Sequence, residues 1–218
     1  MSSIRVLIAD DEALVRHALR AYVSANDRLS VVGEASNGIE AVELSRELQP
    51  DIVVMDLRMP VMNGIEATRA ITSELPGTTV IAVTTFSTER YVIAALQAGA
   101  AGYVVKDTPP EGIIEAIIDV HEGRSVLSAQ VTGELINAVR AGGTELSRVG
   151  HAVEALTERE LSIVEFLAQG MSNAEIANEL HLSQATIKTQ LSRIFGKWGV
   201  RDRVQVLIHA VKANLVQL

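Results

Sequence analysis

The stretch IRVLIADDE (residues 4–12) begins with six residues typical of a buried strand and ends in three acids. A segment with helical spacing, Glu12–Ser24, comes next. The same alternation of a short apolar run with an amphipathic segment occurs five times before residue 122. Strands that alternate with helices form a parallel sheet with helices on both faces. The first half of the chain is therefore predicted to be an α/β domain with a doubly wound, five-stranded parallel sheet.

The expected elements of this domain follow from apolar periodicity and from the positions of Pro and Gly. Strands are expected at residues 4–9, 29–34, 51–55, 79–83 and 102–105, and helices at 12–24, 38–47, 64–74, 88–98 and 111–122. In the first helix we expect Leu14, Ala18 and Ala21 to share one face, with Tyr22 beside it.

The second half of the chain has a different character. One amphipathic helix is expected near residues 128–141, and a Gly-bearing, weakly periodic stretch follows it. From Leu156 onward the pattern predicts four short helices with polar turns, an all-α domain. We expect a first domain at 1–123, a linker with its helix at 124–154, and a second domain at 155–218.

Composition narrows the class of protein. Apolar residues make up 48 % of the chain, and there is no cysteine, which excludes disulfides, cysteine-ligated zinc and thiol catalysis. The five histidines lack metal-ligand spacing, so no zinc site is predicted. No secretory signal is visible, and no apolar run approaches the roughly 18 residues that span a bilayer. We therefore expect a cytoplasmic protein that has no membrane partner.

Charge is unevenly distributed along the chain. Residues 1–122 hold 9 Lys and Arg against 18 Asp and Glu, although the whole chain carries a net charge of only −8. From Lys188 to Arg203, five basic residues accompany one acid. A local basic stripe of this kind indicates nucleic-acid binding better than overall charge does.

Polar residues follow the expected strands where four of them end: Asp10 and Asp11 after the first, Asp56 after the third, Thr84 after the fourth, and Lys106 after the fifth. These ends share one edge of a parallel sheet, where α/β proteins bind ligands. Clustered carboxylates repel one another, and a hard cation such as Mg²⁺ relieves that repulsion. Asp56 can attack a phosphoryl group, while Mg²⁺ and Lys106 neutralise its charge and Thr84 donates a hydrogen bond.

Residues 4–122 closely resemble the receiver domains of bacterial two-component response regulators. The motifs are LIADDE (7–12), VVMDLRMPVMNG (53–64), IAVTTF (81–86) and GAAGYVVKD (99–107). The resemblance implies a flavodoxin-like fold with Asp56 as the phosphoacceptor. It also implies that Asp11, Asp56 and the main-chain carbonyl of Arg58 bind Mg²⁺, with Asp10 assisting largely through water.

The same resemblance assigns the residues of a switch. Thr84 is implied to be the switch hydroxyl, Tyr103 the aromatic side chain that changes rotamer, and Lys106 the partner of the phosphate. The chain departs from the pattern at Asp107, where many receivers have a proline with a cis peptide bond.

The second domain contains the pattern of a helix-turn-helix. Thr157 with Glu160, and Ser172 with Glu175, have capping-box spacing and predict two helix starts. Ser183 is expected to cap a third helix that runs toward Trp198, and a final helix is expected over 202–214. A helix, a tight turn and a second helix form a DNA-binding motif whose second helix enters the major groove.

The third helix has two distinct sides at about 100° per residue. Ile187, Leu191, Ile194 and Trp198 share the inward side, and the opposite side is small, polar and basic, which suits a major groove. The candidate DNA contacts are Thr186, Lys188, Thr189, Ser192, Arg193, Lys197, Arg201 and Arg203, the last three as anchors to the DNA backbone.

ALTERELSIVEFLAQGMSNAEIANELHLSQATIKTQLSRIFGKWGVRDRVQ (155–205) resembles the LuxR-type helix-turn-helix domain, and with a receiver it is similar to the NarL/FixJ class of response regulators. The resemblance implies that a sensor histidine kinase phosphorylates Asp56 and promotes a homodimer on double-stranded operator DNA. The helices near 12–24 and 110–122 are implied to pair the receivers and the final helix to pair the DNA-binding domains. RNA polymerase is a further candidate partner.

Two alternatives stay open at this point. One is a Mg²⁺-dependent enzyme with an aspartyl-phosphate intermediate, although a phosphatase of the haloacid-dehalogenase type would need a second Asp where Arg58 stands. The other is a DNA-binding regulator that works without phosphorylation. We expect a regulator of transcription and not an enzyme.

Overall fold

The computed structural model describes residues 3–84, 89–122, 155–200 and 202–216, together with 132, 135–137 and 139; for 84, 89, 90 and 92 it describes the backbone alone. The chain divides into two compact units, Met1–Glu122, here called the α/β unit, and Gly123–Leu218, here called the helical unit. Each unit is described by itself.

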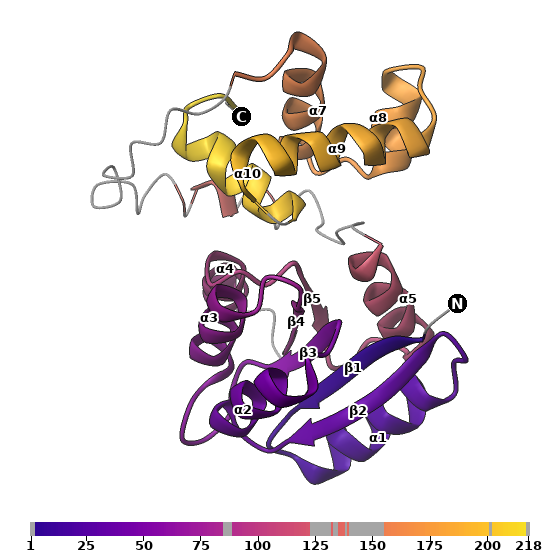
Figure 1. Cartoon of the computed structure of the whole chain (residues 1–218), viewed down its shortest axis with the longest axis vertical. Helices are drawn as coiled ribbons and strands as arrows, with labels where there is room; N and C mark the ends of the chain where they lie inside the picture. Colours follow the sequence, from indigo (N-terminus) through magenta and orange to yellow (C-terminus); the bar gives the residue numbers. More distant parts are fainter. Residues whose placement is uncertain are drawn as a thin grey trace. The chain divides into compact units, whose positions relative to one another are not determined.

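The α/β unit is built on one parallel sheet (Figure 1). Its strands run in the order β2-β1-β3-β4-β5, and each neighbouring pair is parallel. The bounds are β1 Ile4–Ala9, β2 Leu29–Ala35, β3 Ile52–Asp56, β4 Thr79–Thr84 and β5 Gly102–Val105. The predicted five-stranded parallel sheet is confirmed.

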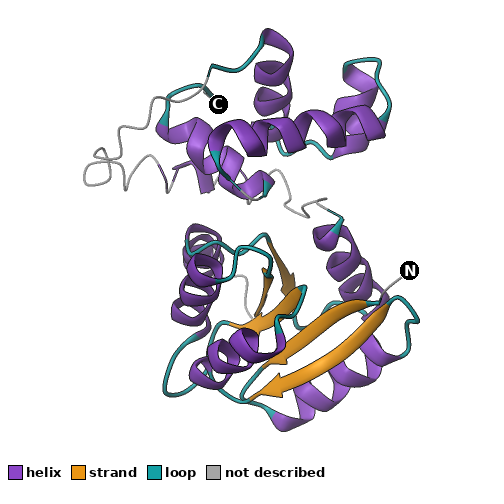
Figure 2. Ribbon diagram, viewed as in Figure 1, coloured by secondary structure: helices purple, strands orange, loops and turns teal. Residues whose placement is uncertain are grey.

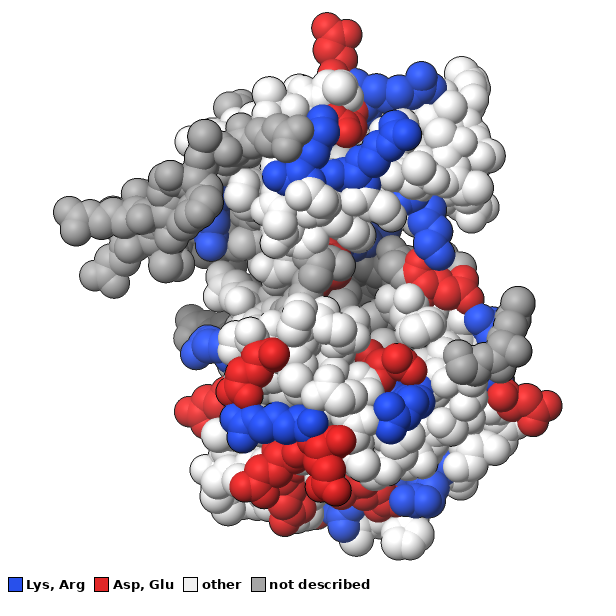
Figure 3. All heavy atoms as spheres, in the orientation of Figure 1, with Lys and Arg blue, Asp and Glu red and all other residues white. Residues whose placement is uncertain are grey.

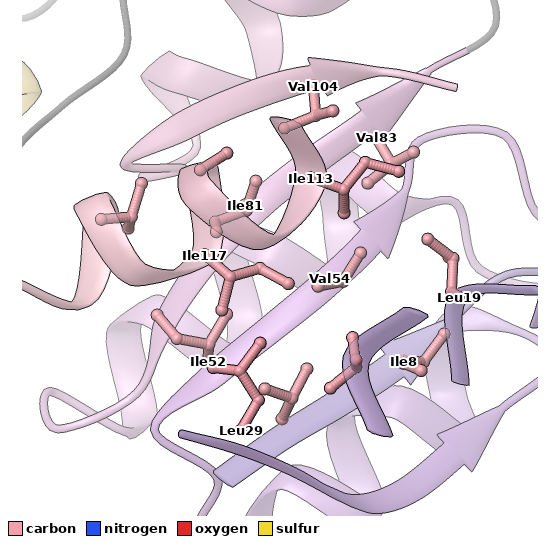
Figure 4. Packing of buried hydrophobic residues seen from close by; sticks show 14 of the residues in the cluster. Ile8, Leu19, Leu29, Ile52, Val54, Ile81, Val83, Val104, Ile113 and Ile117 are labelled. Atoms are coloured by element: carbon pink, nitrogen blue, oxygen red, sulfur yellow. The ribbon is translucent and has the colours of Figure 1, made fainter. Parts of the chain in front are cut away.

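Helices cover both faces of this sheet (Figure 2). They are α1 Ala13–Ser24, α2 Gly38–Leu48, α3 Gly64–Glu74, α4 Glu89–Gln97 and α5 Pro110–His121. Alternate residues of β1 point to opposite faces: Val6 and Ile8 pack in the cluster that contains α1 and α5, while Leu7 and Ala9 pack with α2 and α3. Figure 4 shows the first of these clusters. Each large apolar side chain so buried stabilises the fold by about 1.5–3 kcal/mol.

The face predicted for α1 is wrong. Leu14 is 83 % exposed and Ala21 is also exposed, whereas Leu19 and Val23 are buried and Val15 and Tyr22 pack beside them. Both sets of residues have helical spacing. The stripe with Val15, Leu19 and Val23 carries more apolar surface than the stripe with Leu14 and two alanines, so burying it is more favourable.

The helical unit contains the four helices expected after residue 155: α7 Glu158–Ala168, α8 Asn173–Glu179, α9 Gln184–Trp198 and α10 Arg203–Lys212. The predicted capping boxes at Thr157 and Ser172 are both present, and Ser183 caps α9. His181, in the turn between α8 and α9, has a left-handed backbone with φ 52°. These features confirm the helix-turn-helix pattern.

The helix expected near 128–141 lies mainly outside the described residues, and the limits of the linker stay a prediction. Residues 132, 135–137 and 139 are helical, and Leu135 and Ile136 are fully buried. Among the helices that the structure describes, none has both the length and the apolar character needed to cross a membrane.

Candidate functional sites

Three acids meet at the carboxyl edge of the sheet in the α/β unit. Asp10 and Asp11 follow β1, and Asp56 ends the neighbouring strand β3. One carboxylate oxygen of each lies within 4.8 Å of the others. Asp10 and Asp56 are buried, whereas Asp11 is exposed. The parallel topology therefore brings together the acids that the sequence placed after separate strands.

Lys106, which follows β5, extends its ammonium group into this cluster. Its Nζ lies 2.7 Å from Oδ2 of Asp10, 3.1 Å from Oδ2 of Asp56 and 3.5 Å from Oε1 of Glu12, and its side chain is 9 % exposed. Glu12 was not among the predicted site residues. The unbroken acidic run from residue 10 to residue 12 is the signal that could have indicated it.

The pKa values of these groups reflect the shared site. Burial raises the pKa of Asp56, and Lys106 opposes that effect while the charge of Asp10 adds to it. Burial by itself lowers the pKa of Lys106, but Asp10 and Asp56 outweigh it and raise that pKa. Lys106 is therefore firmly charged, and it does not fully neutralise the acids around it.

The loop between β3 and α3 holds Asp56 in place. A side chain at Gly64 would put a Cβ 1.9 Å from the main-chain oxygen of Asp56, so only glycine allows the loop to approach the strand end this closely. The amide of Arg58 donates to Oδ1 of Asp56 at 3.4 Å. Val61, in the same loop, is 82 % exposed with a left-handed φ of 68°.

The residues predicted to form a switch lie on the neighbouring strands. Thr84 ends β4 and pairs with Val105 of β5, but its side chain lies outside the described part of the chain. Tyr103 pairs with Ala82 and is partly buried. Lys106 and Asp107 are joined by a trans bond, because no cis peptide bond occurs among the described residues.

Helix α9, the third helix predicted for the second domain, exposes the face that is expected to contact DNA. Ile187, Leu191, Ile194 and Trp198 are buried, as predicted. The side chains on the outward face are exposed: Lys188, Thr189, Ser192 and Arg193. Neither Lys188 nor Arg193 pairs with any acid that the structure describes. On the face drawn in Figure 3, Lys and Arg side chains gather on the helical unit and acids predominate over the α/β unit.

Three hydroxyls of this face make local hydrogen bonds. Thr189 donates to the carbonyl of Ala185 at 2.9 Å, and Ser192 donates to that of Lys188 at 3.0 Å. The Oγ1 atom of Thr186 lies 2.8 Å from Oγ of Ser183 in the first turn of α9. Each hydroxyl oxygen still has a lone pair with which to accept a hydrogen bond.

The residues that were predicted to anchor the DNA backbone have different surroundings from the other candidate DNA contacts. Arg203 is buried and donates to the carbonyl of Met171 at 2.6 Å, and its pKa falls to about 10 because of this burial. Because this guanidinium is buried against a carbonyl of its own unit, we correct the prediction for Arg203 and assign it to packing rather than to the DNA backbone. Lys197 is ion-paired at 2.7 Å with Glu160 of α7. Arg201 lies outside the described residues.

Trp198, at the end of α9, stacks on His209 of α10 with ring centroids 4.7 Å apart. Burial lowers the pKa of His209, and the nearby charge of Lys212 adds to the effect. This ring pair joins α9 to α10.

Comparison with known proteins agrees with both units. Residues 6–118 match the model of the response regulator receiver domain, and residues 154–210 match that of the bacterial regulatory proteins of the luxR family. The chain therefore belongs to the NarL/LuxR family of two-component response regulators, with a receiver domain and a helix-turn-helix DNA-binding domain.

Several relatives match over nearly their whole length. The transcriptional regulatory protein LnrK of Bacillus subtilis is 39 % identical over 214 residues, which are 96 % of this chain and 97 % of LnrK. The response regulator protein VraR of Staphylococcus epidermidis is 37 % identical, covering 99 % of this chain and 100 % of VraR. The crystal structure of ChrA, a response regulator in a heme-sensing two-component system, is 36 % identical with a TM-score of 0.52, covering 99 % of this chain and 100 % of ChrA.

The acid cluster fits the cation that receiver domains bind at such a pocket. Its donors are all oxygens, two of the three carboxylates are buried, and one lysine does not compensate their charge. Hard oxygen ligands with an exposed side for water are what Mg²⁺ prefers.

Proposed function

We propose that this protein is a transcription factor switched by phosphorylation of Asp56 by a sensor histidine kinase. The observation that carries the proposal is the placement of Asp56 within 4.8 Å of Asp10 and Asp11, with Lys106 bridging Asp10 and Asp56. This constellation has the nucleophile and the charge-neutralising groups that phosphoryl transfer requires.

In the proposed reaction a carboxylate oxygen of Asp56 attacks the phosphorus of the donor. The bond between phosphorus and the donor histidine nitrogen, or the acyl oxygen of a small phosphodonor, breaks as an acyl phosphate forms. Lys106 stabilises the negative charge on the transferred group. Asp11, Asp56 and the main-chain carbonyl of Arg58 would hold Mg²⁺ directly, Asp10 would assist through water, and the bound ion would neutralise phosphoryl oxygens.

The phosphoryl group would then change the conformation of the surface of the α/β unit. Thr84 would donate a hydrogen bond to it, and Tyr103 would change rotamer as the surrounding strands and helices repack. The exposed Leu14 and an apolar pocket of about 180 Å³, lined in part by Val15, Tyr22 and Ile113, support a homodimer through α1 and α5. The pocket is also lined by Lys106, which supports coupling between phosphorylation and pairing.

The DNA-binding output would come from α9. Its exposed face contains no acid, which supports contacts from Lys188, Thr189, Ser192 and Arg193 in a major groove. Thr186, Lys197 and Arg201 would lie near the sugar-phosphate backbone of the DNA. A dimer would place two such helices on operator half-sites about one helical turn apart, with α10 pairing the domains. RNA polymerase remains a candidate partner of the bound dimer.

Operator selection from random duplex DNA tests the proposal. The full chain, Asp56→Asn and the control Asp27→Asn, which changes an exposed acid away from the cluster, are each treated with acetyl phosphate and Mg²⁺ or left untreated. The wild type and the control should take up a single phosphoryl group and select a two-fold symmetric site more strongly when treated. Asp56→Asn should do neither.

Three other outcomes would overturn it. Equal binding by all proteins in both states would indicate a regulator that works without phosphorylation. Failure to select any DNA would remove the output. Sustained turnover of small phosphomonoesters by the wild type would indicate an enzyme.

A further inference from the structure

Asp11 differs from the other two acids in how its carboxylate is held. Asp10 accepts a hydrogen bond from the amide of Glu12 at 2.9 Å and pairs with Lys106, and Asp56 is held by Lys106 and by the amide of Arg58. The carboxylate of Asp11 has no partner among the residues that the structure describes. No side-chain hydrogen bond to a described residue orients it, so the backbone torsions of residue 11, which set the direction of its Cα–Cβ bond, decide where the carboxylate can reach.

Those torsions are defined by the two peptide planes on either side of the Asp11 Cα atom. One plane carries the carbonyl of Asp10 and the other the carbonyl of Asp11. A single atom, Nη1 of Arg16, donates to both carbonyls, at 2.8 Å and 3.1 Å. Holding both planes restricts φ and ψ of Asp11 together, and so fixes the Cα–Cβ bond from which its carboxylate comes within 4.8 Å of that of Asp56.

Arg16 is itself held in place. It lies on the first turns of α1, its side chain is only 18 % exposed, and its Nε lies 3.5 Å from Oε2 of Glu34 near the end of β2. Glu34 also pairs with Arg20, one turn further along α1. The guanidinium thus joins the acid loop to an ion pair outside the cluster.

From this geometry we infer that Arg16 is a positioning residue for Mg²⁺ binding, acting through the backbone on either side of Asp11. The inference rests on the proposed function, because it concerns the cation site of the same acid cluster. It was not visible in the sequence, where Arg16 is one basic residue among several on an amphipathic helix.

The direction in which Mg²⁺ affinity changes when Arg16 is replaced distinguishes a positioning role from a purely electrostatic one. Removing a positive charge near a cation site should leave Mg²⁺ affinity unchanged or increase it. Removing a group that orients a metal ligand should instead weaken binding, typically about 10- to 100-fold. Arg16→Met should therefore lower the affinity, although it makes the site more negative.

Arg20→Met is the matched control, because it removes the same charge from the same helix and the same partner, Glu34, without touching the acid loop. Mg²⁺ binding to the full-length proteins is measured by isothermal titration calorimetry, with thermal unfolding in EDTA to verify that each is folded. We expect Arg16→Met to raise the Kd at least about 10-fold and Arg20→Met to leave it at or below the wild-type value. Arg16→Lys, which keeps the charge but has a smaller donor group, should lie between them and serves if Arg16→Met does not fold.

The rate of phosphorylation by acetyl phosphate provides a second reading. If Arg16 acts through Asp11, the Mg²⁺ concentration for half-maximal rate should rise while the rate at saturating Mg²⁺ stays near that of the wild type. Equal Mg²⁺ affinities for the wild type and both Arg16 variants would overturn this inference and leave the proposed function intact. A wild type that binds no Mg²⁺ would overturn both.

Discussion

Lys106 and Lys188 show that the two units use lysine in opposite ways. In the α/β unit, Lys106 is nearly buried and has three acids within 3.5 Å of its ammonium group. In the helical unit, Lys188 is exposed on α9 and pairs with no acid that the structure describes. Stabilising a phosphoryl group during its transfer requires a positive charge at a fixed position. Binding a polyanion such as DNA requires positive side chains that are exposed and not already paired with acids.

The helical unit also contains charges that connect its own helices and loops. The buried Glu160 is ion-paired with the partly buried Lys197, and the buried Arg203 donates to the carbonyl of Met171, whereas Lys188 and Arg193 are exposed and pair with no described acid. The basic stripe from residue 188 to residue 203 therefore has two parts with different duties. The predictions below test this division.

The largest effect is expected from Lys106→Ala. Removing the cation leaves Asp10 and Asp56 buried without compensation, so the free energy of unfolding of the α/β unit should fall by about 3 kcal/mol in EDTA. Millimolar Mg²⁺ should restore part of the loss. Urea denaturation measures both, and Arg28→Ala, which breaks the exposed pair with Glu122, should cost under about 1 kcal/mol. Equal losses in the two variants would contradict the role given to Lys106.

Arg203→Leu should have the next largest effect, on stability alone. The substitution leaves the carbonyl of Met171, in the loop before α8, without the donor that Arg203 supplies, which should cost about 1–3 kcal/mol of the free energy of unfolding of the helical unit. The salt dependence of DNA binding by the folded variant should match that of the wild type. A shallower dependence would show that Arg203 contacts phosphate after all.

Glu160→Gln should destabilise the helical unit in a pH-dependent way. Burial alone raises the pKa of Glu160, but hydrogen bonds from Lys197 and Thr157 outweigh it and hold the pKa below its usual 4.5. The ionised carboxylate therefore stabilises the fold, by about 1 kcal/mol. Its contribution is fully present above pH 4.5 and is lost as the pH falls through the lowered pKa. Denaturation at a series of pH values should show the wild type and the variant converging in acid; a constant gap would refute the ion-pair explanation.

Lys188→Ala should have the smallest effect on stability, within about 0.5 kcal/mol, because the side chain is exposed and pairs with no described acid. If Lys188 contacts a phosphate, the slope of log K against log salt concentration should decrease by about one. Fluorescence anisotropy with a labelled operator measures the slope. A slope identical to that of the wild type would remove Lys188 from the DNA surface.

The sequence predicted the acid site well because parallel strands end at one edge of the sheet, where Asp10, Asp56 and Lys106 were expected. The strand order and the length of the Lys106 side chain, which reaches past β4, bring the ammonium group to the acids. The inward face of α1 could not be decided in the same way, because Leu14 and Val15 begin two stripes with the same spacing. Which stripe of α1 faces the sheet depends on how much apolar area each stripe buries against it.

The duties of individual charges were the least predictable feature. Arg203 and Lys188 are both basic residues near the recognition helix, and nothing local distinguishes them. Only the packing of α10 against the loop before α8 shows that the carbonyl of Met171 is the partner of Arg203. Arg16 was missed for the same reason, since its partners are carbonyl oxygens, which have no identity in the sequence.

The stacking of Trp198 on His209 makes the protein its own optical probe. Trp198 is the sole tryptophan of the chain, so indole emission from the intact protein arises only from the junction of α9 and α10. A protonated imidazole that stacks on an indole ring quenches the fluorescence of the indole. Because burial lowers the pKa of His209, we expect the emission of Trp198 to decrease only below the pH at which a free histidine titrates. Any event that separates the two rings can be followed by emission without a label.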